Sequence, residues 1–316
     1  MLGTISSGYD SATAAALCRR VGMDEAVSIT TGREGAEDHG AEIARILGLE
    51  LHLYNRNAWR KHALAEVPFV ASNSRGGEVF FKAAEPHLTG RVLVTGFHGD
   101  KMWGKATTAL GPDLVRGDMS GLSLCEYRLI VGFIHLPLPF MGVRDIAKVH
   151  ALSNSPELRE WDVPGDYSRP ICRRIVESAG VPRDAFGVTK KLASVHFGQG
   201  QVQLSPEASL DYHQWLRDNR SVWAQRKLHA PRPPGRFSRA VLANYQLVER
   251  GTRALTKFAP MRTRAWILRA VSRYQRHLTR RVNLHDSLFP WAIARLARLY
   301  ADRSASDGAD ASITRR

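Results

Sequence analysis

The stretch ISSGYDSATAAAL, residues 5–17, decides the fold because a strand turns directly into a helix within it. An apolar strand over residues 2–6 leads into small hydroxyl side chains, one glycine and Asp10, and an alanine-rich helix follows over residues 11–21. Gly8 permits the tight or left-handed turn that such a junction needs. The stretch therefore predicts that the chain opens with one strand–helix unit of an α/β fold.

The residues that follow repeat this unit. A helix is predicted over residues 37–48, where apolar residues have helical spacing and Gly48 ends the pattern. Further strands are predicted over residues 25–30, 49–54 and 91–96. This alternation indicates an α/β fold with a doubly wound parallel sheet that helices cover on both faces. Residues 110–225 are predicted to be mostly helical, with a clear helix over 168–180.

The positive charge is concentrated near the C-terminus. The net charge is +15, and residues 226–303 carry the whole excess, with 18 Lys and Arg against 3 Asp and Glu. Three helices are expected over residues 236–301, broken near Pro260 and Pro290. The sequence thus predicts three parts: a first domain over residues 1–225, a basic helical appendage over 226–303 entered through the linker 229–239, and a disordered tail over 304–316.

The cysteines and the hydropathy pattern indicate the cellular compartment in which the protein is expected. Cys18, Cys125 and Cys172 have no metal-ligand spacing, so they are interpreted as reduced thiols, and a catalytic cysteine is the less favoured interpretation. We find no secretory signal at the start of the sequence and no apolar stretch long enough to span a membrane. The chain is therefore expected to be cytoplasmic.

The side chains between the first predicted strand and the first predicted helix are of the kinds that bind an anion. Backbone N–H groups in such a turn point inward, and the helix adds its positive N-terminal end. Ser6, Ser7 and Ser11 supply hydroxyl donors for phosphate oxygens, and Asp10 fits beside phosphate if Mg²⁺ lies between them. The alternative is structural, with Asp10 or Ser11 as the cap of the helix. On the first interpretation the junction holds a magnesium-bound polyphosphate.

Five segments of the chain together resemble one family. SSGYDS, residues 6–11, resembles the S-G-G-x-D-S pyrophosphate loop of the ATP-pyrophosphatase (HUP-like) superfamily, with Ser7 in place of the first glycine. The other segments are VSITTGREGAEDHGAEIARILGLELH (27–52), VLVTGFHGDKMWG (92–104), HLPLPFMG (135–142) and YSRPICRRIVESAGVPRDAFGVTKKLAS (167–194). In order and spacing they are similar to the synthetase domain of asparagine synthetase and beta-lactam synthetase, over most of residues 2–200.

The resemblance implies an ATP-dependent ligase reaction. Enzymes of this family adenylate a carboxylate with loss of pyrophosphate, and an amine or ammonia then displaces AMP to form an amide. Mg²⁺ and a lysine stabilise the negative charge on the phosphates. The implied roles are pyrophosphate binding by Ser6, Ser7, Gly8, Asp10, Ser11 and Gly96, adenine contact by Ile29, magnesium binding by Asp10 and Asp100, and catalysis by Lys191 or Lys190. Lys191 is preferred because Ala193 then falls on the small residue of the family pattern.

The half of the pattern that would bind the acceptor departs from the family. Phe97 replaces a glutamate or tyrosine, His98 a glycine, and Lys101 an acid. His135 replaces a glutamate, and Pro137 an arginine. His135 or His98 can serve as the base, since neutral imidazole suits that role near pH 7, and the alternative is that both are structural. These departures predict ATP binding with an altered substrate or a reduced activity.

The resemblance also implies partners for the reaction. The substrates would be a small-molecule or peptide carboxylate and an amine or ammonia. No glutaminase domain with its cysteine nucleophile precedes the loop in this sequence, so ammonia would come from solution or from a separate glutaminase subunit. Because the loop begins only five residues into the sequence, we expect either an earlier natural start or a split system.

The basic appendage admits several partners. Arginines are mixed with aromatic and aliphatic residues through residues 236–301. The favoured interpretation is packing on the core or contact with a partner protein; an anionic membrane surface comes second and nucleic acid last. Two alternatives to the ligase follow. One is a non-catalytic nucleotide-binding or scaffold protein that acts through these helices, and the other is a tRNA-modifying ATP pyrophosphatase.

Overall fold

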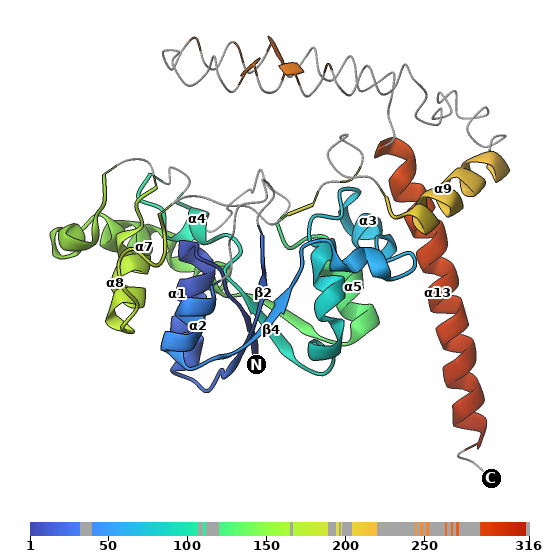
Figure 1. The fold of residues 1–316 in the computed structure, drawn as a ribbon, viewed down its shortest axis with the longest axis horizontal. Coiled ribbons are helices and arrows are strands. Elements are labelled where there is room, and N and C mark those ends of the chain that lie inside the picture. Colours follow the sequence, from blue (N-terminus) through green and yellow to red (C-terminus); the bar gives the residue numbers. More distant parts are fainter. Residues whose placement is uncertain are drawn as a thin grey trace. The chain divides into compact units, whose positions relative to one another are not determined.

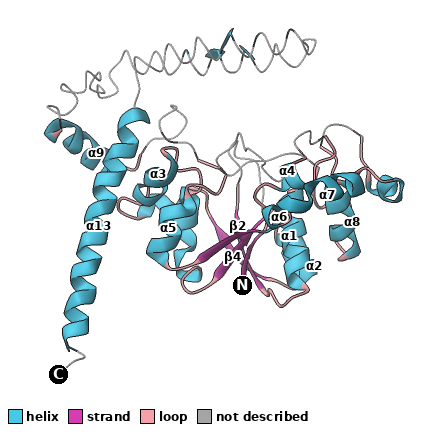
Figure 2. Cartoon of the chain, turned by 180° about the vertical axis from the view of Figure 1, so that it is seen from behind, coloured by secondary structure: helices cyan, strands magenta, loops and turns pink. Residues whose placement is uncertain are grey.

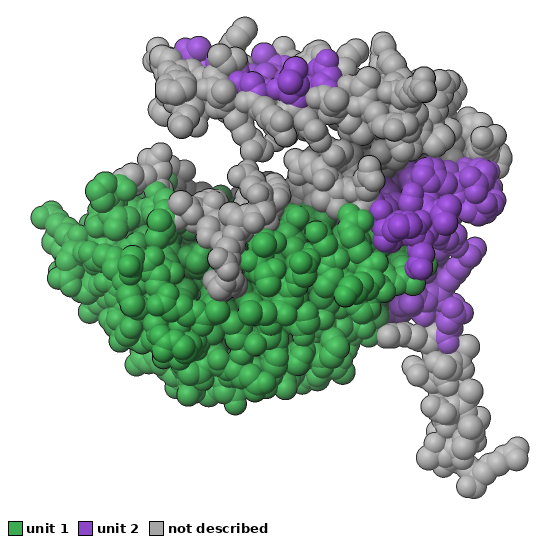
Figure 3. Space-filling view, viewed as in Figure 1, with its two compact units in different colours: residues 1–195 green, residues 196–316 purple. Residues whose placement is uncertain are grey.

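The computed structural model describes residues 1–31, 40–106, 110–111, 120–164, 167–188, 194–195, 197, 204–219 and 285–313, with isolated positions between 244 and 271. The chain divides into two compact units, Met1–Val195 and His196–Arg316, which Figure 3 shows in different colours. The boundary that we expected from the sequence lay at residue 225. Each unit is described by itself below.

The first unit is built on a sheet of five parallel strands in the order β3-β2-β1-β4-β5. The strands are β1 Leu2–Thr4, β2 Glu25–Ile29, β3 Glu50–Tyr54, β4 Val92–Thr95 and β5 Ile134–Pro137. The predicted α/β class with a doubly wound parallel sheet is confirmed. Four strands lie within two residues of their predicted ends, whereas β5 lies within residues 110–225, which were expected to be mostly helical. This short strand ends in a proline and has no apolar run, and it forms by pairing with β4.

Helices cover both faces of this sheet, as predicted. Helices α1, α2 and α8 lie on one face, and α3 and α5 lie on the other (Figures 1 and 2). The α-helices of this unit are α1 Tyr9–Arg19, α2 Ala41–Leu47, α3 Val67–Asn73, α4 Gly99–Met102, α5 Leu124–Val131, α6 Leu138–Met141, α7 Ile146–Ser153 and α8 Pro170–Ser178. The 3₁₀ helices are η1 Ala58–Lys61, η2 Val79–His87, η3 Val143–Asp145 and η4 Pro156–Trp161.

Local signals set several helix ends. Gly48 has φ 65°, the left-handed conformation that ends α2 as predicted. Pro170 is the first residue of α8, a position where its missing N–H costs nothing. Four alanines of α1 are buried, Ala12, Ala14, Ala15 and Ala16, together with its first residue, Tyr9. All three cysteines are free thiols; Cys18 and Cys172 are buried, and Cys125 is exposed.

A group of charged side chains closes the amino end of the sheet. Arg91 Nη1 lies 2.7 Å from Glu25 Oε1, and His52 Nε2 lies 3.1 Å from Glu25 Oε2. The hydrogen bond from Arg91, followed by that from His52, lowers the pKa of Glu25 to about 2. Glu25 is the first residue of β2, and Arg91 directly precedes β4, so the ion pair joins two strands that are not neighbours in the sheet.

The described part of the second unit consists mainly of α9 Pro206–Asp218 and α13 His285–Ile313. The two helices are joined by Trp291, which is fully buried and donates from Nε1 to Asp211 Oδ2 at 3.1 Å, and by a bond between the hydroxyls of Tyr212 and Ser287. These contacts help to offset the backbone hydrogen bond that Pro290 cannot make.

One prediction for this unit is wrong: we expected a break near Pro290, but α13 continues through that residue. The helix ends at Ile313, within residues 304–316, and the disorder expected for that tail stays a prediction. The linker 229–239, Pro260 and most of the expected basic helices lie outside the described residues. Among the described residues, no helix combines the length and the apolar character that crossing a membrane requires.

Candidate functional site

The candidate site lies at the point of the sheet where the order in which strands are added changes direction. From β1 the chain continues to β2 and β3 on one side, and β4 and β5 are added on the other side. In doubly wound sheets the loops that leave the two strands at such a point diverge, and ligands bind between them at the carboxyl ends. Here the loops cover residues 5–8 after β1 and residues 96–98 after β4. We call this position, at the carboxyl ends of β1 and β4, the switch-point crevice, after the place where such folds bind ligands.

Two glycines let the second loop pack directly on the first turn of α1. A Cβ atom added to Gly96 would lie within 3.0 Å of the backbone carbon and oxygen of Asp10 and of the Ser11 nitrogen. A Cβ atom added to Gly99 would lie within 3.0 Å of the Asp10 carboxylate. The structure therefore brings the Asp10 side chain to the backbone that directly precedes Asp100.

Hydroxyl groups surround the loop after β1. Ser6 Oγ lies 2.7 Å from Ser11 Oγ and accepts a hydrogen bond of 3.2 Å from the Gly8 N–H. The Gly187 N–H donates to the Ser7 carbonyl oxygen at 2.8 Å, and this bond fixes the loop from outside. Two hydroxyls and the N-terminus of an 11-residue helix thus meet at one place, and this set of groups suits an anion.

The start of α1 corrects two expectations. Gly8 has φ −82° and ψ 161°, so the loop turns with extended backbone and does not use the left-handed conformation that glycine allows. Gly8 is also the N-cap, and no side chain caps the helix there. The alternative in which Asp10 or Ser11 is the cap is therefore wrong. The helix begins at Tyr9, so both residues lie in its first turn.

Arg169, which was not among the residues predicted from the sequence, forms an ion pair with Asp10. Arg169 precedes α8 as its N-cap, and its side chain is only 7% exposed, whereas that of Asp10 is 30% exposed. The guanidinium carbon lies 5.8 Å from the ring centre of Tyr9 and 5.4 Å from that of Tyr167. A positive charge at the start of a helix is unfavourable, because the N-terminal end of the helix dipole is itself positive. The position of Arg169 at the start of a predicted helix was therefore the one sequence signal that its side chain has another role.

The surroundings keep Arg169 charged. Burial acts to lower its pKa, but the charge and hydrogen bond of Asp10 outweigh burial, and the pKa of Arg169 is raised. Burial also raises the pKa of Tyr167 to about 12. A second buried arginine, Arg173, donates from Nη2 to the Tyr9 hydroxyl at 2.7 Å. Two guanidinium groups thus lie around Tyr9 at the start of α1, and each is paired with a carboxylate, Arg169 with Asp10 and Arg173 with Glu177.

The loop after β4 contains a glycine-like conformation at a residue that is not glycine. His98 has φ 71° and ψ 9°, the left-handed region that non-glycine residues rarely adopt. Its buried ring lies 5.7 Å from the ring of Phe140. Such strain is concentrated at functional sites in proteins. Asp100 follows in the first turn of α4, with its carboxylate 3.7 Å from Lys101 Nζ.

His135 lies on β5 beside the second loop. Its Nε2 atom is 2.9 Å from Thr95 Oγ1, and its ring is 5.7 Å from that of Phe97. Burial, followed by the charges of Arg128 and His98, lowers the pKa of His135 to about 4. The ring is therefore neutral at pH 7, as a base must be, but it is a weaker base than an ordinary histidine.

The lowered pKa of His135 predicts a pH dependence of stability. Because the folded pKa of about 4 is below the unfolded value of about 6.5, the stabilisation is complete above pH 6.5 and is lost as the pH falls towards 4. The expected loss is about 2–3 kcal/mol. Urea unfolding between pH 7 and pH 4 measures it, and His135→Gln should flatten this dependence. His62→Gln, which changes an exposed histidine, is the control and should keep the wild-type slope; equal slopes in all three proteins would contradict the prediction.

The remaining candidates are placed as follows. Ile29 is the last residue of β2, half-buried and paired with Tyr54 of β3, so it lies at the carboxyl edge of the sheet as expected. Lys190 and Lys191 lie outside the described residues. The structure thus places Ser6, Ser7, Gly8, Asp10, Ser11, Gly96 and Asp100 in or next to the two loops at the carboxyl ends of β1 and β4, and it adds Arg169 through the ion pair with Asp10.

Comparison with protein-family models, with curated proteins and with solved structures gave no significant match.

Proposed function

We propose that the switch-point crevice binds Mg·ATP and that the chain uses ATP to adenylate a carboxylate for amide formation, as an asparagine synthetase-like ligase. The observation that carries this proposal is the position of Asp10. Its carboxylate adjoins the backbone of the second loop at Gly99, pairs with the buried Arg169, and follows directly on the hydroxyl loop after β1. A polyphosphate with a divalent cation matches this mixture of charges.

The groups around Asp10 support phosphate binding. Ser6, Ser11 and the first turn of α1 offer hydrogen-bond donors and a positive helix end. Arg169 adds a guanidinium group, which binds phosphate oxygens in a fixed planar geometry. In the proposed complex Arg169 shares its charge between Asp10 and the phosphates. Its stacking on Tyr9 and Tyr167 holds the side chain in place for that contact.

The residues also fit magnesium. Mg²⁺ is usually held by one or two carboxylates together with phosphate oxygens, and Asp10 and Asp100 are the carboxylates at this crevice. When bound, Mg²⁺ would neutralise charge on the phosphates and so ease attack on the α-phosphate. A lysine from residues 190–191 would serve the same purpose. Gly99, whose Cα closely approaches the Asp10 carboxylate, is the residue directly before Asp100, which supports a joint role for the two aspartates.

A non-catalytic nucleotide-binding protein is the second candidate. It is favoured by His135, whose pKa of about 4 makes it a poor proton acceptor at pH 7. Phe97, which contacts that ring, cannot accept a proton at all. Release of AMP from ATP in the presence of a panel of carboxylates and amines separates the two candidates, because only the ligase forms AMP.

The proposal predicts that both aspartates contribute to Mg·ATP binding. Asp10→Asn and Asp100→Asn should each weaken magnesium-dependent ATP affinity by at least about tenfold, since a charge-assisted contact contributes about 1.5–3 kcal/mol. Isothermal titration of the purified chain with ATP, with and without Mg²⁺, measures the effect. Circular dichroism must first show that each variant is folded at the temperature of the titration.

Asp24→Asn is the matched control, because Asp24 is exposed and directly precedes β2 at the other end of the sheet. It should bind Mg·ATP as the wild type does. The proposal fails if the wild type does not bind Mg·ATP, or if all three variants bind it equally well.

A further inference from the structure

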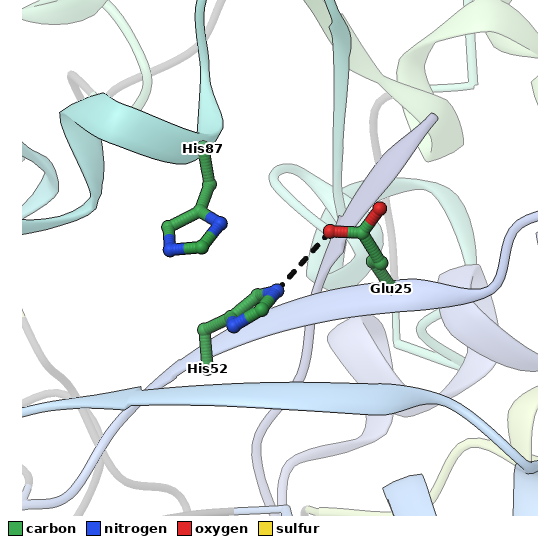
Figure 4. Close-up of side chains that lie close together, drawn as sticks. All are labelled: Glu25, His52 and His87. Atoms are coloured by element: carbon green, nitrogen blue, oxygen red, sulfur yellow. Dashed lines mark hydrogen bonds and ion pairs between the residues drawn. The ribbon is translucent and has the colours of Figure 1, made fainter.

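Three potential metal ligands meet away from the switch-point crevice. Glu25 is the first residue of β2, His52 is the middle residue of β3, and His87 is the last residue of η2. Each offers a nitrogen or oxygen atom, and these atoms all lie within 4.8 Å of one another. Figure 4 shows the two imidazole rings and the carboxylate arranged around a common space. This cluster has no part in the proposed binding of Mg·ATP.

The contacts within the cluster leave His87 available as a ligand. His52 Nε2 lies 3.1 Å from Glu25 Oε2, and the rings of His52 and His87 stack with centres 3.8 Å apart and planes at 26°. Among the described residues, His87 makes ring contacts with His52 and Tyr54 but no side-chain hydrogen bond. An imidazole nitrogen with a lone pair therefore lies beside a carboxylate and a second imidazole.

We propose that Glu25, His52 and His87 bind a divalent transition-metal ion of the Zn²⁺ class. Two imidazoles and one carboxylate form a ligand set that suits such ions, whereas Mg²⁺ and Ca²⁺ prefer sites made of oxygen atoms alone. All three side chains are half-buried, so water can fill the remaining coordination positions. This is the arrangement of an open, three-ligand site.

A hydrogen bond that orients the Glu25 carboxylate is already present. Arg91 Nη1 holds Glu25 Oε1 at 2.7 Å, so the carboxylate is oriented with Oε2 towards the histidines. Ligating carboxylates in metal sites are commonly held by such outer hydrogen bonds. Coordination through His52 Nε2 requires the proton on that nitrogen to move to Nδ1, with no net change in charge. The ion then replaces the hydrogen bond between His52 and Glu25.

A bound ion would join three elements that are distant in sequence. It would connect the start of β2, the middle of β3 and the end of η2, and so hold η2 against the sheet. An ion that binds only the folded chain raises the unfolding temperature in proportion to the logarithm of its concentration above Kd. The site is therefore expected to stabilise the first unit, independently of any nucleotide at the crevice.

The test uses the full chain, without a histidine tag and freed of metal with a chelator. Zn²⁺ at about a hundred times its Kd should raise Tm by at least about 5 °C in the wild type. His52→Gln and His87→Gln should weaken Zn²⁺ binding by more than about tenfold, because even outer-shell changes cost that much. Co²⁺, added in place of Zn²⁺, should give visible absorption bands in the wild type that the two variants lack.

His62→Gln is the matched control, since it removes an exposed histidine of η1's C-terminal end. It should keep wild-type Zn²⁺ affinity. The proposal is overturned if Zn²⁺ neither binds nor stabilises the wild type, or if His62→Gln weakens binding as much as His87→Gln does. If a variant does not fold in metal-free buffer, the Co²⁺ spectrum of the wild type decides: bands of a nitrogen- and oxygen-ligated ion support the site, and their absence refutes it.

Discussion

Gly96→Ala is expected to destabilise the first unit by at least about 3 kcal/mol, because the added methyl group overlaps backbone that cannot move aside. The new Cβ atom would lie within 3.0 Å of two backbone atoms of Asp10 and one of Ser11. A flexible side chain could rotate away, but the first turn of α1 is held by its own hydrogen bonds. The loop after β4 and helix α1 would have to separate. Urea unfolding followed by circular dichroism measures the change in free energy.

A second glycine of the same unit provides the control for this prediction. A Cβ atom added to Gly142 would meet its nearest neighbours, in Pro139 and Met102, at 3.6 and 3.7 Å, which is ordinary van der Waals contact. Its φ of −86° is also open to any residue. Gly142→Ala should therefore change stability by less than about 1 kcal/mol. If Gly96→Ala unfolds at the same urea concentration as Gly142→Ala, the close packing of the second loop on α1 is wrong.

The ion pair between Asp10 and Arg169 carries the second large effect. Asp10→Asn leaves the buried guanidinium without its counter-charge and is expected to cost about 2–3 kcal/mol, somewhat less than for a fully buried pair because Asp10 is 30% exposed. Arg169→Met removes the charge and keeps an apolar side chain against Tyr9 and Tyr167. The double variant should be more stable than the sum of the two single changes predicts, by about 1–3 kcal/mol. The four proteins form a double-mutant cycle that urea unfolding can measure.

An exposed ion pair of the same unit is the control for this cycle. Lys148 Nζ lies 2.8 Å from Asp145 Oδ1, and both side chains are well exposed to solvent. Screening by water should leave no measurable coupling between them. If the cycle at Asp10 and Arg169 also gives no coupling free energy, then neither charge stabilises the other in the folded chain. The role proposed for Arg169 at the phosphates would then lose its basis.

Gly96→Ala, the cycle at Asp10 and Arg169, and the Mg·ATP titration test different levels of the same site. Gly96 tests whether the two loops pack as the structure has them, and the cycle tests whether Asp10 and Arg169 form a charged pair. Mg·ATP binding tests what the pair is for. A chain that passes the first two tests and fails the third has the architecture of the crevice but not the proposed ligand.

The sequence by itself determined most of the architecture of the first unit. The alternation of apolar strands and helical spacing placed four strands within two residues of their observed ends. Gly48 marked the end of α2, and the position of SSGYDS after the first strand marked one side of the crevice. These features are readable because each depends on neighbours within a few residues, through side-chain periodicity and the conformational freedom of glycine.

Only the tertiary structure decided which side chains meet. Arg169 pairs with Asp10 from 159 residues away, and no local pattern announces such a contact. The same holds for β5, which becomes a strand only by pairing with β4, and for His87, which joins Glu25 and His52 through the packing of η2 beside β3. Long-range ion pairs and ligand clusters depend on how whole elements pack, because burial removes water and makes partners of groups that the sequence keeps far apart.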